Sequence, residues 1–340
     1  MNFSPKETHN KIFEKIKPSL HWDGIKPLCR HKSECKDILV KLLGIDAMVK
    51  CEPMLQIVKR EDIGDNEHIH FAVQVESGYY TNCHLLLPKS RKGVLPLCVC
   101  LEGHVSGAHL AVGIEKYPYD DVYISHDVDF CVQAVKRGFA GLAIEQRGFG
   151  ENGGSLESGA TDCAHISQVA ALMGRTIVGE RVWDVQRVVD AVLDTFSDTV
   201  TMRGSVLMGE SGGGTVTYYT ACLDDRFELY VPIVALCTYE DSIVKISHCS
   251  CNYIPGIAKY FDMGDLAALI APKKILVFST TNDEWFPLSG AKKAYGELER
   301  IYKAVGAENN CKMVIAQGGH RFFENIGWRE MLKLLNSEKQ

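Results

Sequence analysis

The sequence predicts an α/β fold with a mostly parallel central sheet, and three observations lead to it. Continuous apolar runs such as Leu97–Leu101 are typical of strands covered on both faces. From Val94 onward, helix-like stretches alternate with such runs, which favours parallel strands with helices on both sides. Finally, Gly209-Glu210-Ser211-Gly212-Gly213 lies between an apolar run and a helix-like stretch, which indicates a sharp strand-to-helix turn.

The chain of 340 residues, 46% of them hydrophobic, is long enough to bury a substantial core. Single α/β domains often reach this size, and no linker or repeat separates a second one. We expect an N-terminal helical lead-in over residues 1–50 and one domain over residues 51–340. Within the lead-in, Cys35–Leu43 has helical apolar spacing, and Gly44 follows where a C-terminal cap belongs.

Charge and hydropathy exclude several classes of partner. The formal net charge of −6 and the lack of Lys/Arg runs argue against nucleic acid and anionic membranes. No segment has the apolar length of a membrane span, and Met1–Lys6 lacks the apolar core of a signal peptide. We therefore interpret the 13 scattered cysteines as reduced thiols and expect a cytoplasmic protein of undetermined oligomeric state.

The strands are expected in two groups. Three β-like runs with turn residues between them, Leu55–Arg60, His68–Val75 and Tyr80–Leu87, predict an antiparallel meander. The parallel strands are expected at Leu97–Leu101, Ala140–Ile144, Ser205–Met208, Tyr230–Leu236, Ile275–Phe278 and Met313–Ala316. Ligands and catalytic groups collect beyond the carboxyl ends of parallel strands, so we expect the functional residues to follow these runs.

The turn at Ser211 has the composition of a nucleophile elbow, with a helix expected over Thr215–Leu223. Such a turn holds its serine in a strained conformation, while side chains at Gly209 and Gly213 would collide with neighbouring elements. The Gly212 N–H then points to where an oxyanion would form. Because this short pattern also occurs in purely structural turns, a catalytic interpretation needs further groups.

Two later strand ends supply those groups. Asp283 follows the penultimate run and His320 follows the last one. A serine hydroxyl needs a histidine to accept its proton, and the histidine needs a carboxylate to fix its tautomer. We predict a Ser211–Asp283–His320 triad. The alternative acids, which also follow strand ends, are Glu284, Glu240 and Asp241.

The first parallel run is followed by small residues that let the chain pass close to the elbow. A backbone N–H near Gly103 and His104 then completes an oxyanion hole with Gly212, and we favour this role over one for the His104 imidazole. The segment from there to Asp127 either covers the substrate cleft or is a surface excursion. The side chains expected to line the substrate site are Trp285, Tyr117, Tyr119 and Tyr123.

Two further groups receive structural interpretations. Arg147, with carboxylates on both sides in the sequence, is expected to be an ion-pair hub, as are Glu180, Arg181 and Asp184 of the predicted helix Thr176–Phe196. The segment His248-Cys249-Ser250-Cys251 contains metal-ligand types, but they lie too close for the usual zinc spacing. With no second cluster evident, we expect no metal.

Together these motifs resemble the acetyl xylan esterase and dienelactone hydrolase-like branch of the α/β-hydrolase superfamily, especially its prokaryotic acetyl-esterase-like members. The resemblance runs from about residue 50 to the C-terminus and lies in Glu102–His104, Glu145–Gly150, Gly174–Asp184, Gly209–Gly214, Cys251–Gly256, Asp283–Pro287 and Gly319–Phe322. It implies the α/β-hydrolase fold, the triad and oxyanion hole named above, and ester hydrolysis without metal or cofactor.

The expected function is that of a serine carboxylic-ester hydrolase that forms an acyl-enzyme on a small-molecule ester. Many related proteins are exported to degrade polysaccharide, whereas this sequence shows no export signal. We therefore expect small acetylated substrates, such as acetylated sugars, rather than polymeric xylan. A thioesterase or serine peptidase on the same triad is the alternative, and a non-catalytic binding protein on a hydrolase scaffold is a more distant one.

Overall fold

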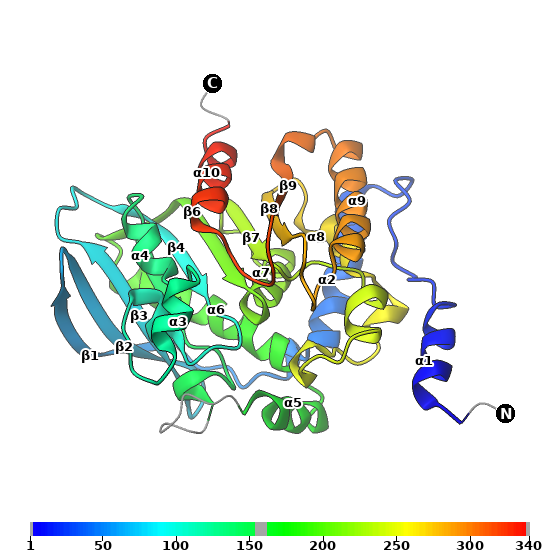
Figure 1. Cartoon of the computed structure of the whole chain (residues 1–340), viewed down its shortest axis with the longest axis horizontal. Helices are drawn as coiled ribbons and strands as arrows, with labels where there is room; N and C mark the ends of the chain where they lie inside the picture. Colours follow the sequence, from blue (N-terminus) through cyan, green and yellow to red (C-terminus); the bar gives the residue numbers. More distant parts are fainter. Residues whose placement is uncertain (1–2, 154–161, 338–340) are drawn as a thin grey trace.

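The computed structural model describes residues 3–153 and 162–337. Within these ranges, the strands form a nine-stranded sheet in the order β1-β2-β3-β5-β4-β6-β7-β8-β9 (Figure 1). The pairs β1–β2, β2–β3 and β3–β5 are antiparallel, and the other pairs are parallel. The predicted α/β fold, with a mostly parallel sheet and an antiparallel N-terminal part, is confirmed.

The N-terminal elements follow the predicted order. Helices α1 (Pro5–Phe13) and α2 (Leu28–Leu43) come first, and Gly44 caps α2 in the left-handed conformation with φ 71°. The antiparallel meander consists of β1 (Met54–Ile63), β2 (Asn66–Glu76) and β3 (Tyr79–Pro88). Strand β1 forms one edge of the sheet, and its pairing with β2 shifts register between Ile57 and Lys59.

The parallel strands each contain one of the predicted apolar runs or most of it. They are β4 (Leu95–Leu101), β5 (Ala140–Ile144), β6 (Val200–Glu210), β7 (Leu229–Ile233), β8 (Lys274–Thr280) and β9 (Cys311–Ala316). The α-helices among them are α3 (Asp120–Ser125), α4 (Phe130–Val135), α5 (Cys163–Leu172), α6 (Ile177–Thr195), α7 (Gly212–Leu223), α8 (Ala267–Ile270), α9 (Leu288–Ala304) and α10 (Glu324–Leu335).

Among the boundaries that differ from the prediction, the end of β7 and the start of α7 have an identifiable cause. Strand β7 ends at Ile233 rather than Leu236, because Val234 adopts φ 44° and turns the chain. Helix α7 begins at Gly212, three positions before the predicted start at Thr215. The glycines that open this helix have low helix propensity, so their pattern does not reveal the helix start.

The core lies on both faces of the sheet, and β4 shows why its sequence is apolar throughout. Leu97, Val99 and Leu101 join the hydrophobic cluster that contains residues of α2, α6, α7 and α9. Cys98 and Cys100 join the opposite cluster, which contains residues of α4 and α10. Because successive side chains of a strand point to opposite faces, both sets are buried. No helix in the described part of the chain is long and apolar enough to cross a membrane.

The start of α7 packs against the end of β4 without space for a side chain. A Cβ on Gly213 would lie 2.1 Å from the carbonyl oxygen of Leu101. A Cβ on Gly209 would lie 2.4 Å from the carbonyl oxygen of Gly213. The glycines of the turn are therefore required by backbone-to-backbone contact, as the sequence predicted.

We expect Gly213→Ala to lower the free energy of unfolding by about 1–3 kcal/mol, because the new methyl group forces strand and helix apart. Gly296→Ala is the matched control. Gly296 lies on α9 with nothing within 4 Å of an added Cβ, and alanine there should stabilise the helix by about 0.5–1 kcal/mol. Urea denaturation of both variants measures the difference. Equal stability of Gly213→Ala and wild type would show that the contact is not tight.

Candidate active site

Ser211 lies at the turn between β6 and α7 with φ 54° and ψ −114°. Residues other than glycine rarely adopt this conformation, and it persists only where the surrounding structure holds it. The Ser211 N–H donates to the carbonyl oxygen of Ile233 in β7 at 2.9 Å, and its carbonyl oxygen accepts from Thr215 N–H in α7 at 2.8 Å. The strained backbone is thus held from both sides, which is the geometry of a nucleophile elbow.

Asp283 and His320 meet beyond the ends of the adjacent strands β8 and β9. His320 Nδ1 lies 3.0 Å and 2.9 Å from the two carboxylate oxygens of Asp283. The Asp283 side chain is only 1% exposed, whereas that of His320 is 20% exposed. Asp283 Oδ1 also accepts the backbone N–H groups of Trp285 and Phe286, both at 2.9 Å. These bonds fix the carboxylate, which can in turn fix the imidazole tautomer.

The alternative acids occupy other surroundings. The Asp241 carboxylate binds Thr238 Oγ1 at 2.9 Å and the ammonium groups of Lys245 and Lys293 at 3.0 Å and 2.6 Å. The Glu240 carboxylate binds Lys245 at 2.7 Å. Glu284 has an exposed side chain. Within the described residues, Asp283 is the acid that contacts His320.

Ser211 and His320 line one cavity of about 350 Å³ at the carboxyl ends of the strands. Gly103, His104, Tyr123 and Trp285 are further parts of its wall. The cavity therefore brings together Ser211, His320 and the loop after β4, while Asp283 lies behind His320 and contacts it from outside the cavity lining. A hydrogen bond between the Ser211 hydroxyl and His320 is not formed in this structure, and catalytic contacts of this kind often tighten only when substrate binds.

The loop after β4 passes beside the serine, as predicted. A Cβ on Gly103 would lie 3.0 Å from Ser211 Cβ. Gly212 is the first residue of α7, and the first N–H groups of a helix have no acceptor within the helix. The His104 imidazole has other contacts: its Nε2 lies 3.5 Å from Cys251 Sγ, and its ring packs at 4.5 Å from that of Phe149. These contacts leave the backbone of His104, rather than its imidazole, for an oxyanion hole.

Glu210 connects the elbow to the loop that carries His320. One of its carboxylate oxygens accepts the Phe322 N–H at 3.0 Å. Burial raises the pKa of the Glu210 carboxyl to about 7, although the neighbouring His320 acts in the opposite direction. The sequence pattern did not single out this residue, because the middle position before the serine tolerates many side chains in a nucleophile elbow.

Of the three tyrosines that were expected to line the substrate site, only some lie at the cavity. Tyr123 does line the cavity. Tyr117 and Tyr119 do not, and the expectation for these two is corrected. The Tyr117 ring packs edge-on against buried His109, and the Tyr119 side chain is 75% exposed. Buried Asp120 holds their segment in place by accepting the N–H groups of Lys116 and Tyr117, each at 2.8 Å.

Arg147 is the predicted ion-pair hub. Its guanidinium binds both carboxylate oxygens of Asp184 at 2.8 Å and Glu76 at 2.9 Å, and lies 3.4 Å from Glu180. Arg181 does not share this role. Its Nε and Nη2 donate to the Arg147 carbonyl oxygen, and Nη2 also lies 3.2 Å from Cys163 Sγ.

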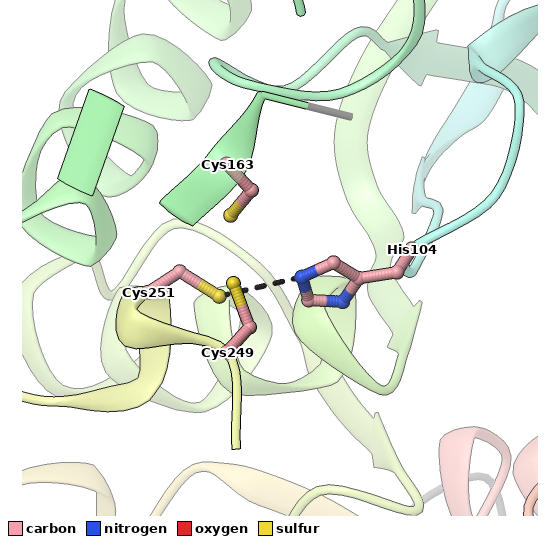
Figure 2. A group of neighbouring side chains, drawn as sticks. All are labelled: His104, Cys163, Cys249 and Cys251. Carbon is pink, nitrogen blue, oxygen red and sulfur yellow. Dashed lines mark hydrogen bonds between the residues drawn. The ribbon is translucent and has the colours of Figure 1, made fainter. Parts of the chain in front are cut away.

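Beside the cavity lies a group that sequence reasoning missed. Cys249 and Cys251 come together with His104 and Cys163, so that their nitrogen and sulfur atoms all lie within 4.8 Å of one another (Figure 2). The statement that no second cluster accompanies the two cysteines is therefore wrong. The members come from three segments far apart in the sequence, so no spacing rule could have joined them.

Comparison with known proteins agrees with this architecture. No family model matches the chain. The protein named "Putative hydrolase YtaP" of Bacillus subtilis (strain 168) is 30% identical over 197 residues, which are 56% of this chain; the match spans 62% of the length of YtaP.

Two of the similar solved structures illustrate the likeness, which extends over most of the chain. One is described as a "putative acetyl xylan esterase" from Bacteroides fragilis NCTC 9343, with a TM-score of 0.78, 16% identity and coverage of 93% of this chain and 83% of the other. The second is a glucuronoyl esterase from Solibacter usitatus, with a TM-score of 0.66, 15% identity and coverage of 96% and 100%. At these identities the likeness shows the fold, and it confirms the predicted α/β-hydrolase fold.

A fluorophosphonate probe should label wild-type protein at one site, Ser211, because a serine activated by histidine attacks the electrophilic phosphorus. Ser211→Ala should show no labelling by intact-mass spectrometry. Ser247→Ala, which removes an exposed serine outside this cavity, should be labelled like wild type. Wild-type protein that resists the probe would instead support a binding protein on this scaffold.

Proposed function

We propose that this protein is a serine carboxylic-ester hydrolase with Ser211 as nucleophile. The observation that carries the proposal is the arrangement around the cavity: a serine at φ 54° shares the cavity with a histidine whose Nδ1 is held by a buried carboxylate. Carboxylic-ester hydrolysis needs a nucleophile, a proton shuttle and donors for an oxyanion. The cavity offers a residue for each role.

In the proposed reaction, Ser211 Oγ attacks the ester carbonyl carbon and its proton passes to His320 Nε2. Asp283 holds Nδ1–H and stabilises the imidazolium that forms. The N–H groups of Gly212 and His104 donate to the oxyanion of the tetrahedral intermediate. His320 then gives the proton to the leaving alcohol, which leaves an acyl-enzyme on Ser211. Water, deprotonated by the same imidazole, completes the hydrolysis.

The proposed substrates are small acetylated compounds, such as acetylated sugars. A cavity of about 350 Å³ is near the lower end of the usual size for small-molecule sites. Tyr123 and Trp285 contribute bulky side chains to its wall. One similar structure is described as a "putative acetyl xylan esterase" and another as a glucuronoyl esterase, so both names refer to carbohydrate esters.

Asp283→Asn should lower kcat/KM for p-nitrophenyl acetate by about 10⁴, because an amide favours the wrong histidine tautomer. Asp241→Asn is the control, because the wild-type Asp241 carboxylate is hydrogen-bonded to Thr238 and does not contact His320. The kcat/KM of this variant should remain within a few-fold of the wild-type value. Steady-state kinetics on both variants gives the comparison. A collapse of activity in Asp241→Asn with Asp283→Asn near normal would move the catalytic acid to the loop after β7.

The value of kcat/KM should fall steeply from acetyl to octanoyl esters, because the aromatic side chains of the cavity wall leave no room for a long acyl chain. In an open apolar pocket each methylene would instead improve binding by up to about 0.8 kcal/mol, so the two cases differ in sign. Trp285→Ala should flatten the decline, whereas Tyr119→Ala, which alters a residue outside the cavity, should leave it unchanged. A kcat/KM series over p-nitrophenyl esters measures the trend; a rise toward octanoyl would contradict the acetyl preference.

A further inference from the structure

The cluster beside the cavity draws its members from three segments. His104 follows β4, Cys163 is the first residue of α5, and Cys249 and Cys251 lie in or next to the short helix Ser250–Asn252. Figure 2 shows the four side chains converging on a common centre. Cys163 and Cys251 are 1% and 2% exposed, so protein covers one side of this centre, whereas His104 and Cys249 border the cavity on the other side. Three thiols and an imidazole are the donor set of a Cys₃His structural zinc site.

The separations of the donor atoms fit a tetrahedral ion. With Zn–S near 2.3 Å and Zn–N near 2.0–2.1 Å, tetrahedral ligand atoms lie about 3.5–3.8 Å apart. His104 Nε2 and Cys251 Sγ are 3.5 Å apart, and all four donor atoms fall within 4.8 Å of one another. The absence of carboxylate oxygens from this set of four favours zinc over magnesium or calcium.

Arg181 gives an independent reason to place negative charge here. This guanidinium is 1% exposed, and its Nη2 lies 3.2 Å from Cys163 Sγ. In the described part of the chain no carboxylate pairs with it, whereas Arg147 nearby binds three carboxylates. A buried cation without a counter-charge is costly. Zinc with three thiolates carries one negative charge, which Arg181 neutralises.

A disulfide explains the arrangement of the three cysteines, His104 and Arg181 less completely than a metal ion does. Joining two of the three cysteines would leave one thiol and the His104 imidazole unused. It would also make two sulfur atoms neutral, and Arg181 would lose the negative charge that a metal–thiolate centre provides. The odd number of sulfurs, the histidine and the buried guanidinium are together explained by a metal.

We propose that His104, Cys163, Cys249 and Cys251 bind a structural zinc ion. Four protein ligands leave no open coordination position, so the ion positions residues and takes no part in bond making. It joins the loop that carries Gly103, the start of α5 and the loop that carries Cys249 at the cavity wall. This proposal replaces the expectation from the sequence that no metal binds, and it does not rest on ester hydrolysis.

The metal content of the purified protein tests the proposal directly. After dialysis against a mild chelator under reducing conditions, we expect about one zinc ion per wild-type chain by plasma mass spectrometry. Cys163→Ser and Cys251→Ser should each lower zinc affinity by about tenfold or more. Cys35→Ser is the matched control, because Cys35 is buried and lies 3.2 Å from His31 Nε2 but outside the cluster. It should keep full zinc content.

Cobalt reconstitution gives a second measurement that needs no variant to fold. Wild-type protein stripped of metal and titrated with Co²⁺ should develop the visible and near-ultraviolet bands of a tetrahedral cobalt–thiolate site. A spectrum without thiolate-to-cobalt bands, or zinc-free wild type after reconstitution with Zn²⁺, would refute the proposal. So would a disulfide within the cluster in protein prepared without oxidant.

These outcomes are separate from those for the proposed function. Fluorophosphonate labelling and ester hydrolysis with no bound zinc would refute the metal site and leave the hydrolase intact. One zinc per chain with no labelling of Ser211 would do the reverse. Chelation of wild-type protein should also lower Tm, because the ion binds the folded chain, while zinc-deficient Cys163→Ser should show no such shift.

Discussion

The close contact between the start of α7 and the ends of β4 and β6 is the constraint on which the site depends. At Gly213 and Gly209 the neighbouring backbone leaves no space for a side chain, so the helix begins directly against the strands. The intervening Ser211 adopts φ 54° in this tight turn. The same contact brings the Gly103 loop beside the serine. The position of Ser211, the proposed nucleophile, is thus set by backbone packing, which adjusts far less readily than side chains do.

The parts of this site that could be predicted are those governed by local pattern and strand direction. The strand-turn-helix order around Ser211 is local, and parallel strands carry Asp283 and His320 to one edge of the sheet whatever the intervening helices do. Tyr117 and Tyr119 could not be placed in this way. Their positions depend on Asp120, whose hydrogen bonds to their segment have no signature in the sequence. The group of three cysteines and His104 could not be predicted for a related reason. Its members are distant in the sequence and come together only in the folded chain.

Two buried arginines near α6 show how the interior balances charge in different ways. Arg147 is surrounded by carboxylates, and its bonds to Asp184 use both oxygens. Arg181, whose guanidinium donates to the Arg147 carbonyl oxygen, faces sulfur instead. Cys163 next to Arg181 belongs to the same group as His104, and His104 borders the cavity that contains Ser211. Cys163 therefore links the buried charge of Arg181 to His104, whose backbone N–H belongs to the proposed oxyanion hole.

The position of β1 at the border of the sheet has a consequence for the behaviour of the protein in concentrated solution. An open border strand presents unpaired amides and carbonyls that can recruit another chain and start aggregation. Here the pairing of β1 with β2 shifts register between Ile57 and Lys59, and irregularities of this kind make an edge strand harder to extend. The neighbouring Arg60 forms an ion pair with Glu67 at 2.9 Å, and an incoming strand would have to remove water from these charges. These features of β1 disfavour the addition of further strands from other molecules to this edge of the sheet.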